Sequence, residues 1–295
     1  MEAKSKSFVY LHSSVFLFGF TAILGELISI NFWSIVWWRA LLTVLILIFV
    51  IKIKDVFIHF KGIRLWQQLF IGLLLGLHWI GFYGAIKIAN PTIALIALSS
   101  SSLITALVEP LLNKNVKWSK SDIVFGILVI PGFILIFNNS SAIHKTGLWI
   151  GLLSTFLGSV FSIYNKKWLV PGHETKMTFL HLVSVFILLS SIFVFLNKMQ
   201  SIVFQVPKGV DWLYFTIFII FCTVISYYLY LKSMLHLNAF DISFAFNMEP
   251  IYGIIVAFFL LNDHKNLSSM VYLGMIFITL IVFLDLYFKL KFKNR

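Results

Sequence analysis

Ten stretches of about 20 mostly apolar residues run through this sequence, and they constrain its fold more than any other feature. The hydrocarbon core of a bilayer is about 30 Å thick, so about 20 helical residues cross it, and a helix satisfies its own backbone hydrogen bonds there. Of the 295 residues, 60% are hydrophobic and only 12% are charged. We therefore predict an all-α integral membrane protein. The ten predicted transmembrane helices are residues 8–30, 32–51, 66–88, 91–112, 121–137, 147–169, 176–196, 211–235, 239–261 and 268–289.

Basic residues gather on one side of this ten-span pattern. Of 23 Lys and Arg residues, 17 fall in connections and tails on that side, 5 fall on the other, and Arg39 lies inside a span. Because loops rich in Lys and Arg stay in the cytoplasm, we predict a multi-pass protein of the cell (inner) membrane. The tails, residues 1–7 and 290–295, are both expected in the cytoplasm. The net charge of +12 is explained by this segregation, and we expect no binding of nucleic acid.

A weak internal repeat divides the ten spans into two sets of five. At a constant offset of 148 residues (227 − 79), equivalent positions pair Trp79 with Tyr227, Asn90 with Asn238 and Ser101 with Glu249. The predicted repeats are residues 8–137 and 147–289. Five is an odd number, so the second repeat enters the membrane with the opposite orientation to the first. Such inverted repeats recur in secondary transporters, where they form a central binding site.

The sequence resembles the EamA-type transporters of the drug/metabolite transporter superfamily. The resemblance rests on Phe18-Gly19-Phe20-Thr21, Trp37-Trp38-Arg39-Ala40, His78-Trp79, Pro91-Thr92-Ile93-Ala94, Glu109-Pro110 and Glu249-Pro250. It implies two five-helix EamA repeats, a central cavity, cytoplasmic termini, and export of amino acids or other small metabolites.

Ionisable residues inside spans are candidate functional residues, since a charge at the bilayer centre costs about 2.5–3.5 kcal/mol on insertion scales. Arg39 is shaped to hold a substrate carboxylate, but it can equally form a structural ion pair with Glu26. His78 and Trp79 lie at mid-depth, with Tyr83 one turn beyond Trp79. They indicate an aromatic cavity wall or ordinary core packing, and His78 can relay protons or donate to a carbonyl.

Further candidates lie in the fourth, eighth and ninth predicted helices. In the fourth helix, Ser101 and Ser102 lead to Glu109 near the cytoplasmic end; the serines suit either a cavity wall or close helix packing. Tyr227, the repeat equivalent of Trp79, is a candidate of the eighth helix. The ninth helix carries Glu249 near mid-depth, with Asn247 beside it. The candidates for proton coupling are Glu249, His78 and Glu109.

The leading prediction is a secondary transporter, driven by an ion or substrate gradient, rather than an enzyme. An intramembrane enzyme is the alternative, but no H-E-x-x-H or G-x-S-x-G occurs. A channel or sensor is a second alternative. We expect no bound cofactor and no metal; the lone Cys222 excludes a cysteine cluster. The G-x-x-x-G patterns at Gly72 and Gly147 can join helices within one molecule or in a homodimer.

Overall fold

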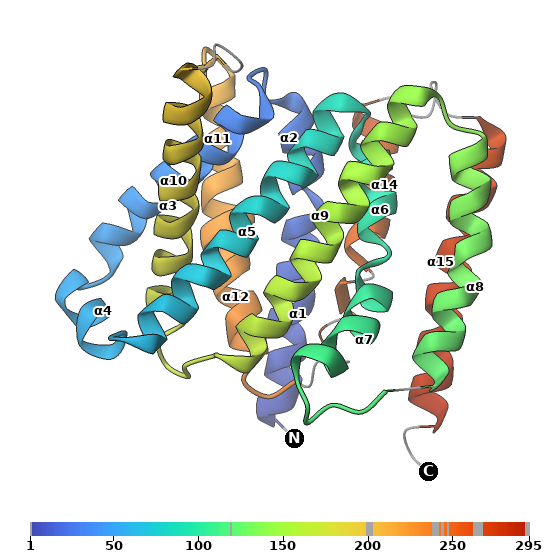
Figure 1. Ribbon diagram of the computed structural model, residues 1–295, viewed down its shortest axis with the longest axis horizontal. Coiled ribbons are helices and arrows are strands. Elements are labelled where there is room, and N and C mark those ends of the chain that lie inside the picture. Colours follow the sequence, from blue (N-terminus) through green and yellow to red (C-terminus); the bar gives the residue numbers. More distant parts are fainter. Residues whose placement is uncertain are drawn as a thin grey trace.

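The computed structural model describes residues 2–118, 120–198, 203–237, 242, 245–246, 248–261 and 268–292. Every regular element among these residues is helical (Figure 1). In chain order the helices are α1 (Glu2–Gly19), α2 (Thr21–Leu27), α3 (Phe32–Val50), α4 (Ile53–His59), α5 (Ile63–Ile88), α6 (Pro91–Leu98), α7 (Ser101–Leu112), α8 (Lys120–Asn138), α9 (Ala142–Lys167), α10 (Glu174–Lys198), α11 (Asp211–Ile219), the π-helical turn η1 (Ile220–Ile225), α12 (Ser226–Ser233), α14 (Met248–Leu260) and α15 (Ser269–Phe292).

Seven helical segments among the described residues are long and apolar enough to cross a membrane. They coincide with seven of the predicted spans and are Ala3–Leu27, Phe32–Val50, Ile63–Ile88, Pro91–Leu112, Ala142–Lys167, Glu174–Phe195 and Asp211–Ser233. The remaining three predicted spans fall on α8, α14 and α15. An all-helical membrane protein is thus confirmed, while the count of ten spans and their division into two repeats stay predictions.

Two asparagines explain where two of these helices begin. The side chain of Asn31 accepts a hydrogen bond from the backbone N–H of Ser34, and that of Asn90 accepts one from Ile93. Both are N-caps, which satisfy backbone donors that the first turn of a helix leaves free. Pro91 follows Asn90 as the first helical residue, where its missing N–H costs nothing. The tight connections predicted at these two positions therefore form as capped turns.

Three long segments are interrupted near their middles. The first breaks at Phe20 between α1 and α2, the second at Ser99–Ser100 between α6 and α7, and the third contains η1. Conversely, α8 continues through Pro131. The three interruptions meet around the centre of the bundle, where backbone polar groups can find partners other than the next turn.

The helices form one bundle in which α5 and α9 run side by side through the middle (Figure 1). α5 rises from the end of the bundle where α1 begins, and α9 returns to that end. Glycines allow close helix contacts: a Cβ on Gly72 would lie 2.4 Å from the carbonyl oxygen of His181, and one on Gly147 would lie 2.4 Å from Cβ of Ala89. Both G-x-x-x-G patterns thus pack helices within one molecule.

Candidate functional site

A cavity lies among the broken helices in the middle of the bundle. The cavity has a volume of about 110 Å³. A single buried water needs only about 10–15 Å³. The cavity therefore has room for several waters or a small organic molecule. Seven of the predicted site residues line it: Arg39, His78, Trp79, Tyr83, Ser101, Tyr227 and Glu249.

Arg39 of α3 is the most constrained side chain in the cavity wall, with 1% of its surface exposed. Its Nε donates to Oγ1 of Thr223 at 2.8 Å, Nη1 donates to the hydroxyl of Tyr83 at 2.7 Å, and Nη2 donates to the carbonyl of Cys222 at 2.9 Å. Glu26 is not among these partners, so the ion pair that the sequence allowed is not formed. Of the five guanidinium N–H groups, three are used within the described structure.

The π-helical turn η1 supplies two of the three groups that hold Arg39. A π-turn widens the helix and spaces its hydrogen bonds differently from those of an α-helix. Here the Cys222 carbonyl accepts from Arg39, and the Thr223 hydroxyl accepts from Arg39 while it donates to the Phe218 carbonyl at 3.0 Å. The irregular turn therefore presents a carbonyl and a hydroxyl to a buried cation.

Aromatic rings enclose the guanidinium. Its central carbon lies 3.7 Å from the ring centroid of Trp79 and 4.3 Å from that of Phe218. Both distances are within the range of cation–π attraction, which is strongest where water is excluded. The Tyr83 ring packs where Gly25 has no side chain, since a Cβ there would lie 2.7 Å from two ring carbons. Aromatic packing and hydrogen bonds thus hold Arg39 in one orientation.

Hydrogen bonds join His78 of α5 to Ser154 of α9. The Nδ1 of His78 lies 2.9 Å from the carbonyl oxygen of Ser154, and the Ser154 hydroxyl donates to the carbonyl of His78 at 2.7 Å. Since a carbonyl can only accept, Nδ1 carries the proton, and in the neutral ring Nε2 is an acceptor. Gly158 makes room for the ring, because a Cβ there would lie 2.8 Å from Nδ1. His78 therefore lines the cavity in a fixed tautomer.

Tyr227 connects the cavity to a chain of buried polar side chains. Its hydroxyl lies 2.8 Å from Nδ1 of His181, and Nε2 of His181 lies 2.8 Å from Oε1 of Gln68. The Gln68 amide nitrogen donates to the Trp168 carbonyl at 3.2 Å, and that of Asn165 donates to the Tyr227 hydroxyl at 3.3 Å. Because Oε1 accepts from His181, Nδ1 accepts from Tyr227. The orientation of the phenol is thereby set by residues outside the cavity.

The polar wall opposite α5 comes from α7, α9 and α14. Ser101 and Thr105 lie one turn apart on α7 and both line the cavity, whereas Ser102 does not. Because successive helical residues are about 100° apart, only one of the adjacent serines faces the cavity. Glu249 of α14 is 7% exposed and belongs to the same wall. Trp79 with Tyr227 and Ser101 with Glu249, the two pairs that the 148-residue offset predicts to be equivalent, therefore share one cavity.

Glu109, another predicted site residue, does not line this cavity. Glu109 is half-buried one turn beyond Thr105, in electrostatic reach of Lys166 near the end of α9. Asn247 lies outside the described residues.

Several cavity residues were missed from the sequence. They include Phe161 and Ser162 of α9, Tyr230 of α12 and Phe246. Tyr230 could have been identified from the sequence as a cavity residue, because it follows Tyr227 by three residues and so lies on the same face of the helix. The Ser162 hydroxyl lies 2.9 Å from that of Tyr230, but serines and phenylalanines are too common in spans to stand out.

These features define a multi-pass helical membrane protein with a partly polar cavity among its helices. Residues 145–284 match the EamA-like transporter family, which confirms the resemblance predicted from the sequence. The family is one of transporters, so the match indicates a membrane transporter of small molecules.

Comparison of structures shows the fold. Sixteen chains of solved structures match, and one, described only as "Crystal structure of protein", has a TM-score of 0.63 at 12% sequence identity. That similarity covers 94% of this chain and 95% of the other. No curated protein sequence matches this chain.

Proposed function

We propose that this protein is a secondary transporter that exports amino-acid-like or other small organic molecules by alternating access through the central cavity. The observation that carries the proposal is the Arg39 guanidinium, held rigidly in the cavity wall. A buried charge costs several kcal/mol. The hydrogen bonds of Arg39 go to two hydroxyls and a carbonyl, while the Glu249 carboxyl of the same wall lies within electrostatic reach. An anionic group of a substrate would add a hydrogen-bonded anionic partner.

The surroundings of Arg39 favour a substrate that is both charged and apolar. Two guanidinium N–H groups are left by the recorded bonds, and a carboxylate can accept from such a pair. Trp79 and Phe161 offer apolar surface in the same cavity, while Glu249 offers a carboxyl group to an ammonium or a proton. An amphipathic molecule with a carboxylate fits this combination.

The two-repeat architecture belongs to the same proposal. Residues 8–137 and 147–289 would each form a five-helix repeat, giving ten spans. The family match at residues 145–284 supports the second boundary, and the two repeat-equivalent pairs in the cavity wall support the relation between the halves. The start of α1 and the end of α15 lie at the same end of the bundle (Figure 1), in keeping with an even number of spans. We place both tails in the cytoplasm of a cell-membrane protein on the distribution of Lys and Arg.

Glu249 is the favoured residue for proton coupling. It lies in the cavity wall, whereas Glu109 lies beyond that wall and His78 is tied to the Ser154 carbonyl. A carboxyl group that is hydrated in one facing state and desolvated in the other would bind its proton with different affinities in the two states. Transport would then depend on the pH gradient.

Purified protein in liposomes tests the function directly. Uptake and efflux of labelled amino acids and organic acids are measured with and without an imposed pH gradient, and protein-free liposomes serve as the background. We expect saturable flux of at least one carboxylate-bearing compound, enhanced by the gradient. Absence of flux for every compound, from protein that remains folded in the bilayer, would refute the transporter proposal.

A further inference from the structure

Two lysines make matching contacts at opposite ends of the bundle. Lys87, in the last turn of α5, donates to the carbonyls of Ile28 at 2.7 Å and Glu26 at 2.9 Å. Lys166, in the last turn of α9, donates to the carbonyls of Met234 at 2.5 Å and Leu237 at 2.8 Å. Each ammonium thus binds carbonyls at the C-terminal end of a neighbouring helix, where the helix dipole favours a cation.

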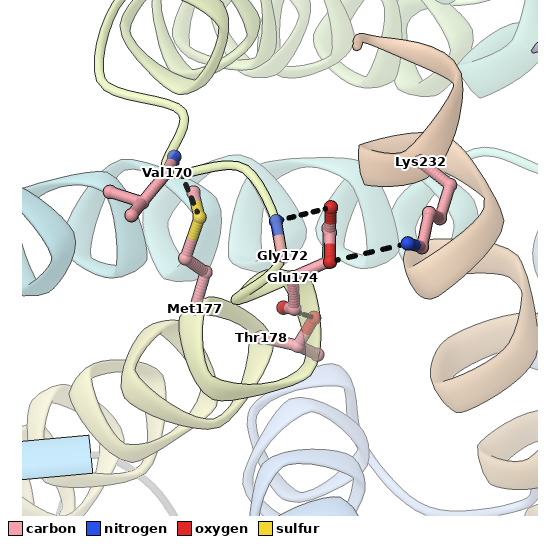
Figure 2. Close-up of polar contacts among 6 residues, drawn as sticks. All are labelled: Val170, Gly172, Glu174, Met177, Thr178 and Lys232. Carbon is pink, nitrogen blue, oxygen red and sulfur yellow. Dashed lines mark hydrogen bonds and ion pairs between the residues drawn. The ribbon is translucent and has the colours of Figure 1, made fainter. Parts of the chain in front are cut away.

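Each lysine contact is reinforced by a carboxylate at the start of another helix. At the Lys87 end, the backbone N–H and the hydroxyl of Ser29 donate to Asp211, the first residue of α11, at 2.9 and 2.6 Å. At the Lys166 end, Lys232 of α12 lies 3.7 Å from Glu174, the first residue of α10 (Figure 2). Glu174 also accepts from the backbone N–H of Gly172 at 3.1 Å. We call these two sets of contacts the Lys87 clamp and the Lys166 clamp.

Both clamps lie one helical turn beyond the cavity. On α5, Tyr83 is the last residue that lines the cavity, and Lys87 follows it by four positions. On α9, Ser162 is the last lining residue, and Lys166 follows it by four positions. One turn of an α-helix is about 5.4 Å. Each clamp therefore joins helices just outside one end of the cavity.

A single composite helix links the clamps to the cavity. The run α11–η1–α12 begins at Asp211 in the Lys87 clamp and ends beside Met234 in the Lys166 clamp. Between them, η1 contacts Arg39 through Cys222 and Thr223. A displacement of this helix at one end would therefore change its contacts at the cavity and at the other end.

We infer that the Lys87 and Lys166 clamps are the two gates of the cavity, and that each opens by release of its lysine from the helix C-terminus. The inference rests on the proposed transport function, because a cavity open to alternate sides needs a separable closure at each end. In the described structure the contacts of both clamps are formed. Loss of one lysine should open one side only.

Side-specific cysteine labelling tests this inference without knowledge of the substrate. Cys222 is the only cysteine in the sequence, so Cys222→Ser gives a background without thiols. Ser101→Cys on that background places one thiol in the cavity wall. A membrane-impermeant maleimide is then applied to intact cells or to inverted vesicles, and the labelling rate is measured from each side.

Lys87→Met should raise labelling about tenfold from the side on which Lys87 lies, and Lys166→Met should raise it about tenfold from the opposite side; tenfold corresponds to about 1.4 kcal/mol. Lys145→Met and Lys61→Met are controls at the two ends, since neither lysine takes part in a clamp. If a methionine variant does not fold, Asp211→Asn or Glu174→Gln weakens the corresponding clamp more gently. These should shift labelling toward the same sides.

Increased labelling from the same side for both lysine variants, or changes under twofold in folded protein, would overturn the gate assignment. Flux in liposomes without a side-specific shift would also overturn it while leaving the transport proposal intact. A side-specific shift without flux of any compound would support the gates and count against the transport proposal.

Discussion

Replacement of Arg39 by lysine tests whether the guanidinium binds a substrate carboxylate. Lysine keeps the positive charge but has no planar fork. Its three N–H groups would be needed by the groups that now hold Arg39, namely Tyr83, Thr223 and the Cys222 carbonyl. The two N–H groups proposed to bind the carboxylate are therefore lost in Arg39→Lys.

The size of the effect follows from those two donors. A hydrogen bond to a charged group contributes about 1.5–3 kcal/mol, so loss of one effective bond weakens binding about 10- to 150-fold. We expect KM for a carboxylate substrate to rise by that factor. The methyl ester or amide of the same substrate cannot form the charged pair and should be affected much less.

The assay compares acid and ester in liposomes that contain wild type or Arg39→Lys. Thr223→Val tests positioning, because it removes the acceptor for Nε of Arg39 and leaves the charge; a smaller loss, again specific to the acid, is expected. Thr223→Ser keeps the hydroxyl and is the matched control. Equal losses for acid and ester in Arg39→Lys would show that Arg39 has only a structural role.

Three further predictions address coupling, packing and pH. Glu249→Gln should abolish accumulation driven by a pH gradient but leave exchange measurable; unchanged accumulation would exclude its proton role. Gly158→Ala should lower the melting temperature, since its Cβ would lie 2.8 Å from Nδ1 of His78 and overpacking costs about 1–3 kcal/mol. Gly84→Ala, with 3.6 Å of space, is the control, and equal effects of the two would contradict this reasoning. In the loop before α10, burial and neighbouring basic side chains lower the pKa of His173, so the folded state binds its proton less readily than the unfolded chain. Stability should therefore fall as pH drops below about 6.5, and His173→Gln should reduce that fall in a thermal-unfolding series.

The length of the apolar stretches in the sequence predicted the helical segments, but it could not predict where those segments are interrupted. The break after Leu98 has a local cause: the hydroxyls of Ser99 and Ser100 donate to the carbonyls of Ile96 and Ala97 at 2.6 and 2.7 Å. Serine hydroxyls compete with helical backbone bonds in this way, so a run of serines carried a signal that we took only for cavity lining or close packing. The break at Phe20 lies where α1 contacts α14. Gly19 beside it lies against α14, where a Cβ would be 3.0 Å from Cβ of Tyr252.

The site residues that could be identified from the sequence are those whose residue type is rare at their depth in a membrane span. Arg39 and Glu249 stand out in a sequence because charges inside spans are costly, and Trp79 stands out at mid-depth because tryptophan favours the membrane interface. Thr223 gives no such signal, since polar neutral residues occur throughout helical spans. Its role depends on which side of the helix it faces, and η1 changes the orientation of the helix faces within a single span.

The π-turn therefore connects the fold and the proposed function. A π-turn contains one more residue than an α-turn, so the helix faces before and after it are offset by one position. Phe218 packs on Arg39 before the turn, and Tyr227 and Tyr230 line the cavity after it. The same turn directs the Cys222 carbonyl to the guanidinium. A helical carbonyl has two lone pairs, so the Cys222 carbonyl can accept from Arg39 and still belong to the helix. The buried arginine and the irregular helix are thus coupled, because η1 supplies two of the three acceptors that hold the Arg39 charge inside the bundle.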